Sequence, residues 1–289
     1  MRGAGFALIT GHSVPREAID ALYNASTVFF GYDHNTKMEA CLNSGYGAGG
    51  YVPVGVEAVA RSRPEGAESA ADVVENLVFS YAGDPQREAV MPGDPPSLQP
   101  AVRAYWAHML RLMRDLMHLS SLALGLTEGY FDAYFENPKC NLRLAHYPAI
   151  AEDDEVHSSG AMRYGAHTDY TGFTILRQDP EADGLQAQMA DGQWVAVPSR
   201  PDALVINAGD LIQVWTNDRW RSPPHRVIKP PSGKAAPPRL SIVFFTGPDE
   251  ETMIEALPTC VEPETNPARH APISAQNHLK TKLQASNTV

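Results

Sequence analysis

The sequence predicts an α+β fold that is mainly β, in which a helical first half packs on a β-rich second half. Apolar residues recur at helical spacing in the first half, most clearly over residues 100–124. After Pro138 the pattern changes to short, often alternating apolar runs, punctuated by Gly, Pro, Asn and Asp. Many short strands with turn signals at this spacing indicate a sandwich or barrel. We expect a single domain over 1–289, with a helical and loop support region (1–137), a β core that carries the site (138–250), and a C-terminal extension ending in a helix (251–289).

The first elements are a strand and a helix. "GFALIT" (5–10) is an apolar run closed by Gly11, and Pro15 suits the first turn of a helix whose apolar positions continue to Phe30. The stretches that follow are rich in Gly, Pro or polar residues and are expected to be irregular. They are 44–55, with one brief strand, a polar surface loop at 61–72, and 83–100.

The clearest helix spans 100–124 and has one apolar face. That face consists of Val102, Trp106, Met109, Met113, Leu116 and Met117. His108 and His118 lie on the same helix, but neither has a ligand partner four residues on, so we interpret them as packed or solvated side chains. A second helix is predicted over 127–135, with Thr127 as its cap.

The second half is predicted to consist of strands. The runs are "CNLRLAHYP", "RYGAHTD", "GFTILRQ", "GLQAQMA", "QWVAVP", "DALVINAG", "DLIQVWT", "PHRVIKP" and "RLSIVFFTG". Asp-Gly within "MADGQW" (189–194) predicts a hairpin between two of them. "SAQNHLKTKL" (274–283) predicts a closing helix capped by Ser274.

The composition indicates which kinds of partner and which cellular compartment to expect. The net charge is −11, from 23 Lys and Arg against 34 Asp and Glu, and an acidic surface disfavours nucleic acid and anionic membranes. A small molecule is the expected partner, and the oligomeric state stays open. The three cysteines, Cys41, Cys140 and Cys260, are odd in number and far apart, which favours free thiols in the cytoplasm. The N-terminal apolar run is too short for a membrane span and lacks a signal-peptide pattern.

"YGAHTDYTGF" (164–173) carries two metal-capable side chains. His167 and Asp169 are two apart, and in a strand such residues point to the same face. The HxD pair alone is a weak signal. A later strand begins with His225, 56 residues beyond Asp169, and two histidines with one carboxylate form the facial triad of non-haem Fe(II) oxygenases. Three protein ligands on one face of an octahedron leave adjacent positions for other ligands.

"RLSIVFF" (239–245) strengthens this interpretation. Arg239 and Ser241 share a strand face, and a guanidinium beside a hydroxyl suits the far carboxylate of a dicarboxylic acid. The phenol of Tyr147, in "NLRLAHYP", can add a donor to the same anion. Arg239 alone would be interpreted as a surface charge, but it follows the triad in an ordered series.

At this point the chain resembles the isopenicillin N synthase-like branch of the 2-oxoglutarate/Fe(II)-dependent dioxygenases. The resemblance covers nearly the whole chain and rests on "GFALITGHSVP", "GYVPVGVEA", "NLRLAHYP", "GAHTDY", "GLQ", "NAGD" and "PHRV…RLSIVFF", which occur in the family's order. Family members usually have a further N-terminal segment with an extra strand, whereas Met1 here starts almost on "GFALIT". We therefore expect a truncated chain or a misplaced start.

The resemblance implies a double-stranded β-helix, or jelly-roll, core with flanking helices. It implies Fe(II) on His167, Asp169 and His225, and 2-oxoglutarate on Arg239 and Ser241. It further implies assistance to 2-oxoglutarate from Tyr147 and Asn141. Within "INAGD", Asn207 and Asp210 are expected to form a turn before a strand carrying Ile212 and Val214.

The implied activity is oxidation of an aliphatic C–H bond of a small soluble metabolite with O₂, releasing succinate and CO₂. A small carboxylated or amino-acid-like metabolite is weakly preferred. Hydroxylation, desaturation and ring closure stay open, as in enzymes of secondary metabolism. The residues expected to face the substrate are Tyr170, Phe173, Arg163, Tyr51 and Phe245.

Three alternatives to this activity stay open. They are an Fe(II) oxidase of the same fold that does not use 2-oxoglutarate, a non-catalytic metal-binding jelly roll, and a zinc hydrolase. The hydrolase is the weakest of them, since the sequence has no HExxH.

Overall fold

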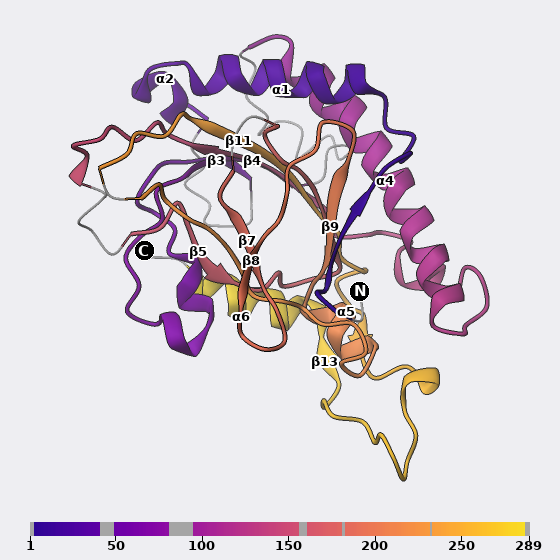
Figure 1. The fold of residues 1–289 in the computed structure, drawn as a ribbon. Coiled ribbons are helices and arrows are strands. Elements are labelled where there is room, and N and C mark those ends of the chain that lie inside the picture. Colours follow the sequence, from indigo (N-terminus) through magenta and orange to yellow (C-terminus); the bar gives the residue numbers. More distant parts are fainter. Residues whose placement is uncertain are drawn as a thin grey trace.

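Two antiparallel sheets face each other in the computed structural model, which describes residues 3–40, 49–80, 95–155, 161–180, 183–231 and 233–286. The large sheet has the order β1-β9-β6-β11-β4-β3-β2 and the small sheet the order β5-β10-β7-β8. Every pairing between neighbouring strands of these sheets is antiparallel. The two sheets form the jelly roll, whose ribbon is shown in Figure 1.

The strands of the large sheet come from the whole length of the chain. In sheet order they are β1 (Phe6–Ile9), β9 (Leu204–Ala208), β6 (Phe173–Arg177), β11 (Arg239–Phe245), β4 (Asn141–Tyr147), β3 (Glu75–Ser80) and β2 (Gly50–Val52). The small sheet consists of β5 (Tyr164–His167), β10 (His225–Val227), β7 (Leu185–Gln188) and β8 (Trp194–Ala196). A separate ribbon pairs β12 (Met253–Ile254) with β13 (Ile273–Ser274). The support region thus adds three strands, β1, β2 and β3, to the large sheet.

Helices flank the two sheets. The described helices are α1 (Arg16–Phe30), α2 (His34–Met38), α4 (Leu98–Ala123), α5 (Asp210–Trp215) and α6 (Ala275–Ser286). Figure 1 shows α1 and α4 on one side of the barrel and α6 on the other. No helix in the described ranges is long and apolar enough to cross a bilayer.

Alternate side chains of a strand point to opposite faces of the sheet, so one face packs in the core and the other faces the site. On β11, Leu240, Ile242 and Phe244 are buried in the apolar cluster that joins the large sheet to α1 and α4. The intervening residues of β11 face the small sheet. A second apolar cluster lies between the two sheets and includes Tyr147, Leu185 and Val227. Side chains at positions 239 and 241 therefore point into the barrel.

Most of the elements predicted from the sequence are confirmed. The strand in 5–10 is β1, the helices beginning after Pro15 and near position 100 are α1 and α4, and the Asp-Gly hairpin joins β7 to β8. Ser274 caps α6, since its Oγ accepts from the Asn277 N–H at 3.3 Å. Cys140 and Cys260 are free and buried, whereas Cys41 and most of 83–100 lie outside the described residues.

Two element predictions are wrong, and one strand was missed. "DLIQVWT" forms α5 and not a strand, because Leu211, Val214 and Trp215 are buried at helical spacing. The helix predicted over 127–135 is reduced to turns and a 3₁₀ turn at Asp132–Tyr134, and Gly129 has a φ of +76°, which a helix cannot accommodate. The strand β3 was not predicted.

The stretch 61–72 is also not a plain surface loop. It contains the end of one 3₁₀ turn, Val59–Ser62, and the whole of another, Pro64–Gly66. Its last residue, Asp72, is buried and accepts hydrogen bonds from the backbone N–H groups of Val59 and Gly165, both at 2.8 Å. Asp72 therefore fixes this segment against β5, the strand that ends in His167.

Candidate active site

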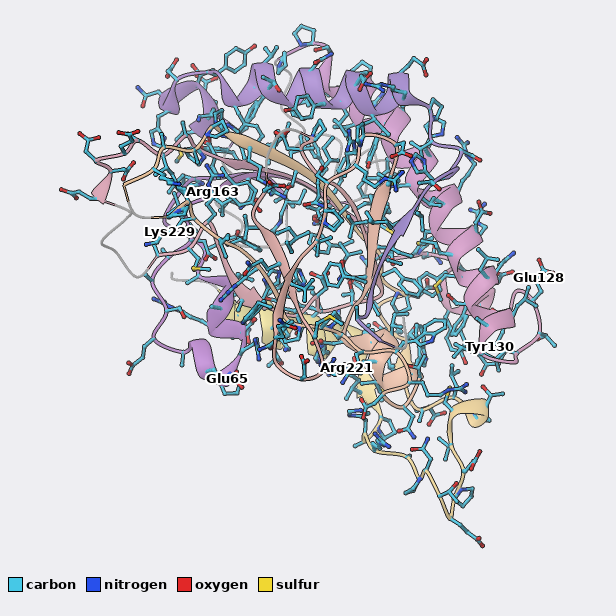
Figure 2. The ribbon with its side chains drawn as sticks, in the orientation of Figure 1. Glu65, Glu128, Tyr130, Arg163, Arg221 and Lys229 are labelled. Atoms are coloured by element: carbon cyan, nitrogen blue, oxygen red, sulfur yellow. The ribbon has the colours of Figure 1, made fainter. Side chains whose placement is uncertain are left out.

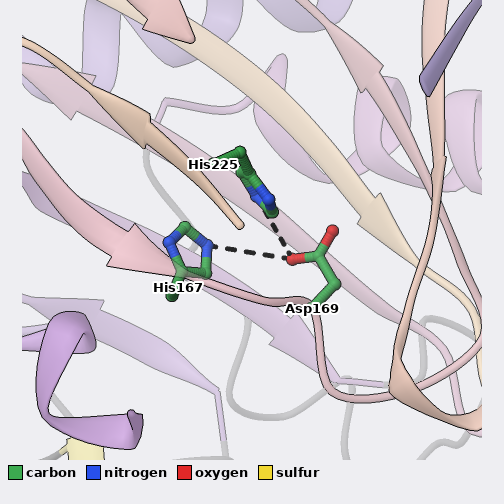
Figure 3. A group of neighbouring side chains, drawn as sticks. All are labelled: His167, Asp169 and His225. Carbon is green, nitrogen blue, oxygen red and sulfur yellow. Dashed lines mark ion pairs between the residues drawn. The ribbon is translucent and has the colours of Figure 1, made fainter. Parts of the chain in front are cut away.

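His167, Asp169 and His225 converge inside the barrel. The Nε2 atom of His167 lies 3.8 Å from Asp169 Oδ1, and that of His225 lies 3.6 Å from the same oxygen. One ligand atom from each of the three side chains lies within 4.8 Å of the other two, and all three side chains are buried (Figure 3). These groups can enclose a single cation from one side, as the sequence predicted.

Strand pairing explains why residues so far apart in the sequence meet. His167 is the last residue of β5 and His225 the first of β10, and the two are paired across the antiparallel ladder. Asp169 lies in the turn after β5. Its carbonyl accepts from the Asp210 N–H at 2.8 Å, so the start of α5 holds this turn in place.

The carboxylate of Asp169 is oriented by two donors. Thr174 Oγ1 donates to Asp169 Oδ2 at 2.5 Å, and Asn207 Nδ2 donates to the same oxygen. Oδ1 is thereby left to point at the two imidazoles. Such hydrogen bonds to a metal-ligating carboxylate fix its orientation.

Both imidazoles are set to ligate through Nε2. His167 Nδ1 lies 2.8 Å from the Gly165 carbonyl, and His225 Nδ1 lies 3.2 Å from the Pro223 carbonyl. A carbonyl can only accept, so each Nδ1 carries a proton, and in the neutral form of each imidazole Nε2 then presents the lone pair. Burial, followed by the nearby His225, lowers the pKa of His167 well below its ordinary value. Two neutral nitrogens and a carboxylate suit Fe(II).

Arg239 is a fully buried guanidinium, only 1% exposed. One terminal nitrogen donates to Ser241 Oγ at 2.6 Å and the other to Gln178 Oε1 at 3.3 Å, while its Nε has no hydrogen-bond partner. Among the described residues it forms no ion pair with a carboxylate. A buried charge without a counterion is strongly unfavourable, so this position is suited to an anion that comes from outside the chain.

Tyr147 and Asn141 stand at opposite ends of β4. Tyr147 is paired with Arg239 across β4 and β11, and its ring centroid lies 5.0 Å from the guanidinium carbon. Asn141 is paired with Phe245 and donates to Ser80 Oγ at 3.0 Å. The length of the strand separates the two, or roughly 20 Å. The expectation that Asn141 helps to hold the anion at Arg239 is therefore corrected: Asn141 belongs to the cavity described next.

A cavity of about 440 Å³ opens beside the metal-capable cluster. Its described lining includes His167 and Asp169 and is otherwise a mixture of apolar and polar side chains. Val52, Val59, Val78, Phe245, Leu279 and Leu283 are the main apolar residues, and Ser80, Asn141, Arg143 and Tyr164 are among the polar ones. The size suits a small molecule held next to the cluster.

The five side chains predicted to face the substrate divide into two groups. Tyr170 and Phe245 line the cavity. The other three lie elsewhere: Phe173 packs against Trp220, Tyr51 donates to Glu75 at 2.5 Å, and Arg163 donates to two backbone carbonyls. The prediction for Phe173 is wrong because of the turn after Asp169. Beyond that turn the even-numbered residue Thr174, and not Phe173, points towards the site.

Several residues of the site were missed, among them Thr174 and Gln178, described above, and Arg143 and Asn207. Arg143 is buried in the cavity wall, where it donates to Glu57 at 3.2 Å and to the hydroxyl of Tyr164 at 2.6 Å. Alternation along β4 places it on the same face as Tyr147, so the sequence held this signal. Asn207 was interpreted as a turn former, but it contacts Asp169.

Comparison with known proteins agrees with this geometry. Residues 138–248 match the 2OG-Fe(II) oxygenase superfamily. Residues 1–101 match a second family model, described as "non-haem dioxygenase in morphine synthesis N-terminal". The 2-oxoglutarate-Fe(II) type oxidoreductase hxnY of Emericella nidulans is 30% identical, with the alignment covering 98% of this chain and 81% of the relative. Validamycin A dioxygenase of Streptomyces hygroscopicus subsp. limoneus is 28% identical, with 88% and 71% covered.

Solved structures show the same fold. A full-length Neurospora crassa protein in complex with alpha-KG superimposes with a TM-score of 0.85 at 28% identity, covering 97% of this chain and 86% of that one. JOX2 in complex with 2OG, Fe and JA gives a TM-score of 0.82 at 28% identity, covering 99% and 80%. The chain belongs to the 2-oxoglutarate/Fe(II)-dependent dioxygenase family, and its cofactors are Fe(II), 2-oxoglutarate and O₂.

Proposed function

We propose that His167, Asp169 and His225 hold Fe(II), that Arg239 and Ser241 hold the far carboxylate of 2-oxoglutarate, and that the adjoining cavity holds a small metabolite. The enzyme then oxidises an aliphatic C–H bond of that metabolite. Hydroxylation, desaturation and oxidative ring closure all begin with cleavage of such a bond.

The observation that carries the proposal is the buried, uncompensated charge of Arg239 in the same barrel as the three ligands. A dicarboxylic acid that reaches the metal with its 2-oxo acid end can place its other carboxylate on this guanidinium. Charge-assisted hydrogen bonds of this kind are among the strongest in proteins. The same observation favours 2-oxoglutarate dependence over an oxidase that would leave Arg239 without an anion.

The chain's own residues position the groups that would bind the cosubstrate and the metal, and they limit the access of water to them. Tyr147 packs its ring on the Arg239 guanidinium, and Thr174 and Asn207 fix the carboxylate that would hold the metal. When bound, Fe(II) supplies the activation of O₂, with 2-oxoglutarate as the source of electrons and succinate and CO₂ as products. All three ligand side chains are buried, which limits their contact with solvent.

The lining of the cavity is suited to a substrate that accepts hydrogen bonds on one side and is apolar on the other. Arg143 is the polar centre of its wall, and Glu57 already neutralises that charge at 3.2 Å. Lys139 at the cavity is likewise paired with Glu250, at 2.8 Å. Neutral carbonyl-bearing molecules therefore fit this described wall better than carboxylic acids do. We accordingly propose them as the substrate class, in place of the carboxylated or amino-acid-like metabolite that the sequence weakly favoured.

We further propose a reduced, cytoplasmic setting and no nucleic acid or membrane partner. The free thiols of Cys140 and Cys260 support the first, and the net charge of −11 supports the second.

The test is the formation of succinate from 2-oxoglutarate by the Fe(II)-loaded enzyme in air. Small neutral amides, heterocycles, amino acids and carboxylic acids are added in turn, and succinate is measured for each. A class of compound that raises succinate release, and that is itself converted in equal amount, identifies the substrate. No succinate from the wild-type enzyme under any condition would exclude the proposal.

A further inference from the structure

Arg163 lies just before β5 and is only 3% exposed. One of its terminal nitrogens donates to the Pro237 carbonyl at 2.8 Å and to the Pro148 carbonyl at 3.2 Å. Figure 2 shows Arg163 on the side of the molecule opposite Glu128 and Tyr130. A side chain with this much buried polar surface, whose partners are both backbone, indicates a positioning role.

The two carbonyls flank the anion site. Pro148 directly follows Tyr147, and Pro237 precedes Arg239 by two residues. Tyr147 and Arg239 are themselves paired across β4 and β11. Arg163 thus links the ends of two strands at the point where both bear a residue of the proposed cosubstrate anchor.

The charge of Arg163 is also uncompensated. Among the described residues it forms no ion pair with a carboxylate, and its Nε has no hydrogen-bond partner. Burial, followed by the neighbouring Arg239, lowers the pKa of Arg163 below its ordinary value. Two guanidinium groups that repel each other inside the barrel are stabilised together when an anion binds beside them.

We propose that Arg163 is a positioning residue for 2-oxoglutarate, which holds the strand ends bearing Tyr147 and Arg239 and adds a second positive charge behind the far carboxylate. This inference rests on the proposed function, because it assumes that Arg239 binds that carboxylate. It assigns Arg163 to the cosubstrate and not to the substrate cavity, from whose described lining it is absent.

The experiment compares two ligands that differ only in the far carboxylate. Affinities of the Fe(II)-loaded protein for 2-oxoglutarate and for 2-oxobutyrate are measured by anaerobic isothermal titration calorimetry. The proteins are the wild type, Arg163→Met, Arg163→Lys and Arg239→Met. Arg226→Met is the matched control, since Arg226 lies on the neighbouring strand β10 but packs on Trp194, with 4.0 Å between its guanidinium carbon and the ring centroid.

The expected result is a loss of about 10- to 100-fold in affinity for 2-oxoglutarate in Arg163→Met, with little change for 2-oxobutyrate. Arg163→Lys keeps the charge and is expected to lose less, and Arg226→Met is expected to bind both ligands as the wild type does. If Arg163→Met does not fold, the same comparison is made with Arg163→Lys, which is then expected to lose part of its preference for 2-oxoglutarate.

Equal weakening of both ligands in Arg163→Met would mean a general structural role and would overturn the inference. Full retention of the preference in Arg163→Met, together with its loss in Arg239→Met, would overturn the inference and leave the proposed function standing. If Arg239→Met also keeps the preference, the proposed anchor itself is wrong.

Discussion

Replacing Arg239 with methionine should have opposite effects on cosubstrate binding and on the stability of the protein alone. Methionine fills a similar volume but carries no charge. In the cosubstrate-free protein the change removes a buried cation that lacks a carboxylate partner, and it also removes the hydrogen bonds to Ser241 and Gln178. In the complex it removes the counterion of the far carboxylate.

The two magnitudes differ enough to be separated. Breaking a buried ion pair by removing one partner costs about 3–5 kcal/mol. At about 1.4 kcal/mol per factor of ten, the dissociation constant for 2-oxoglutarate should rise roughly 100- to 5000-fold. Without 2-oxoglutarate, the two lost hydrogen bonds cost about 1 kcal/mol each, and relief of the unpaired charge offsets that loss. The free energy of unfolding should stay level or increase.

The assay is thermal and chemical unfolding with and without 2-oxoglutarate, together with direct titration of the ligand. Wild type should be stabilised by the ligand in proportion to the logarithm of its concentration, and Arg239→Met should lose this effect. Arg226→Met serves again as the control. A variant that is strongly destabilised without ligand, yet binds 2-oxoglutarate as tightly as the wild type, would show that Arg239 is a structural charge and refute the reasoning.

Three further predictions follow from other contacts. Asn207→Ala removes a donor to Asp169 and should weaken Fe(II) about 10- to 100-fold, as measured by competition with a chelator. Arg143→Met should raise KM for the metabolite while leaving 2-oxoglutarate affinity unchanged, as measured by steady-state kinetics. Burial alone would raise the pKa of Glu75, but hydrogen bonds from His146, Lys37 and Tyr51 lower it to about 2, so its contribution to stability is present above about pH 4.5 and lost as the pH falls towards 2. Glu75→Gln should therefore remove roughly 3 kcal/mol of acid-dependent stability, as measured by urea unfolding from pH 7 to pH 2.

Each of these predictions has a contrary result. Unchanged Fe(II) affinity in Asn207→Ala would mean that Thr174 alone orients Asp169. A parallel loss of 2-oxoglutarate affinity in Arg143→Met would mean that the cavity wall and the anion site are one site. Identical pH profiles for wild type and Glu75→Gln would mean that the pKa of Glu75 is not lowered in the folded protein.

The sequence was sufficient for the residues whose positions depend on local period. Arg239 and Ser241 share a face because they are two apart on β11. His167 ends β5, and Asp169, two residues on, lies close to it in the turn that follows. The order of the motifs along the chain then supplied His225. These are short-range rules, and they hold here because each residue lies in or next to a regular strand.

The sequence was insufficient where partners are distant or where a run is too short to have a clear period. The carbonyl partners of Arg163 are 15 and 74 residues away, so nothing near Arg163 indicates its role. The six residues of α5 fit both an alternating and a helical pattern, and only their packing against the rest of the barrel decides between them. Phe173 was misplaced because the turn at 168–172 changes strand parity.

A crystal structure of the protein with Fe(II) and 2-oxoglutarate, grown without oxygen and measured at the iron absorption edge, tests where the metal and the far carboxylate bind. We expect one anomalous peak, within bonding distance of Nε2 of His167, Nε2 of His225 and Oδ1 of Asp169, and the far carboxylate of 2-oxoglutarate on Arg239. Iron bound at other side chains, or a far carboxylate that rests on Arg143 instead of Arg239, would contradict it.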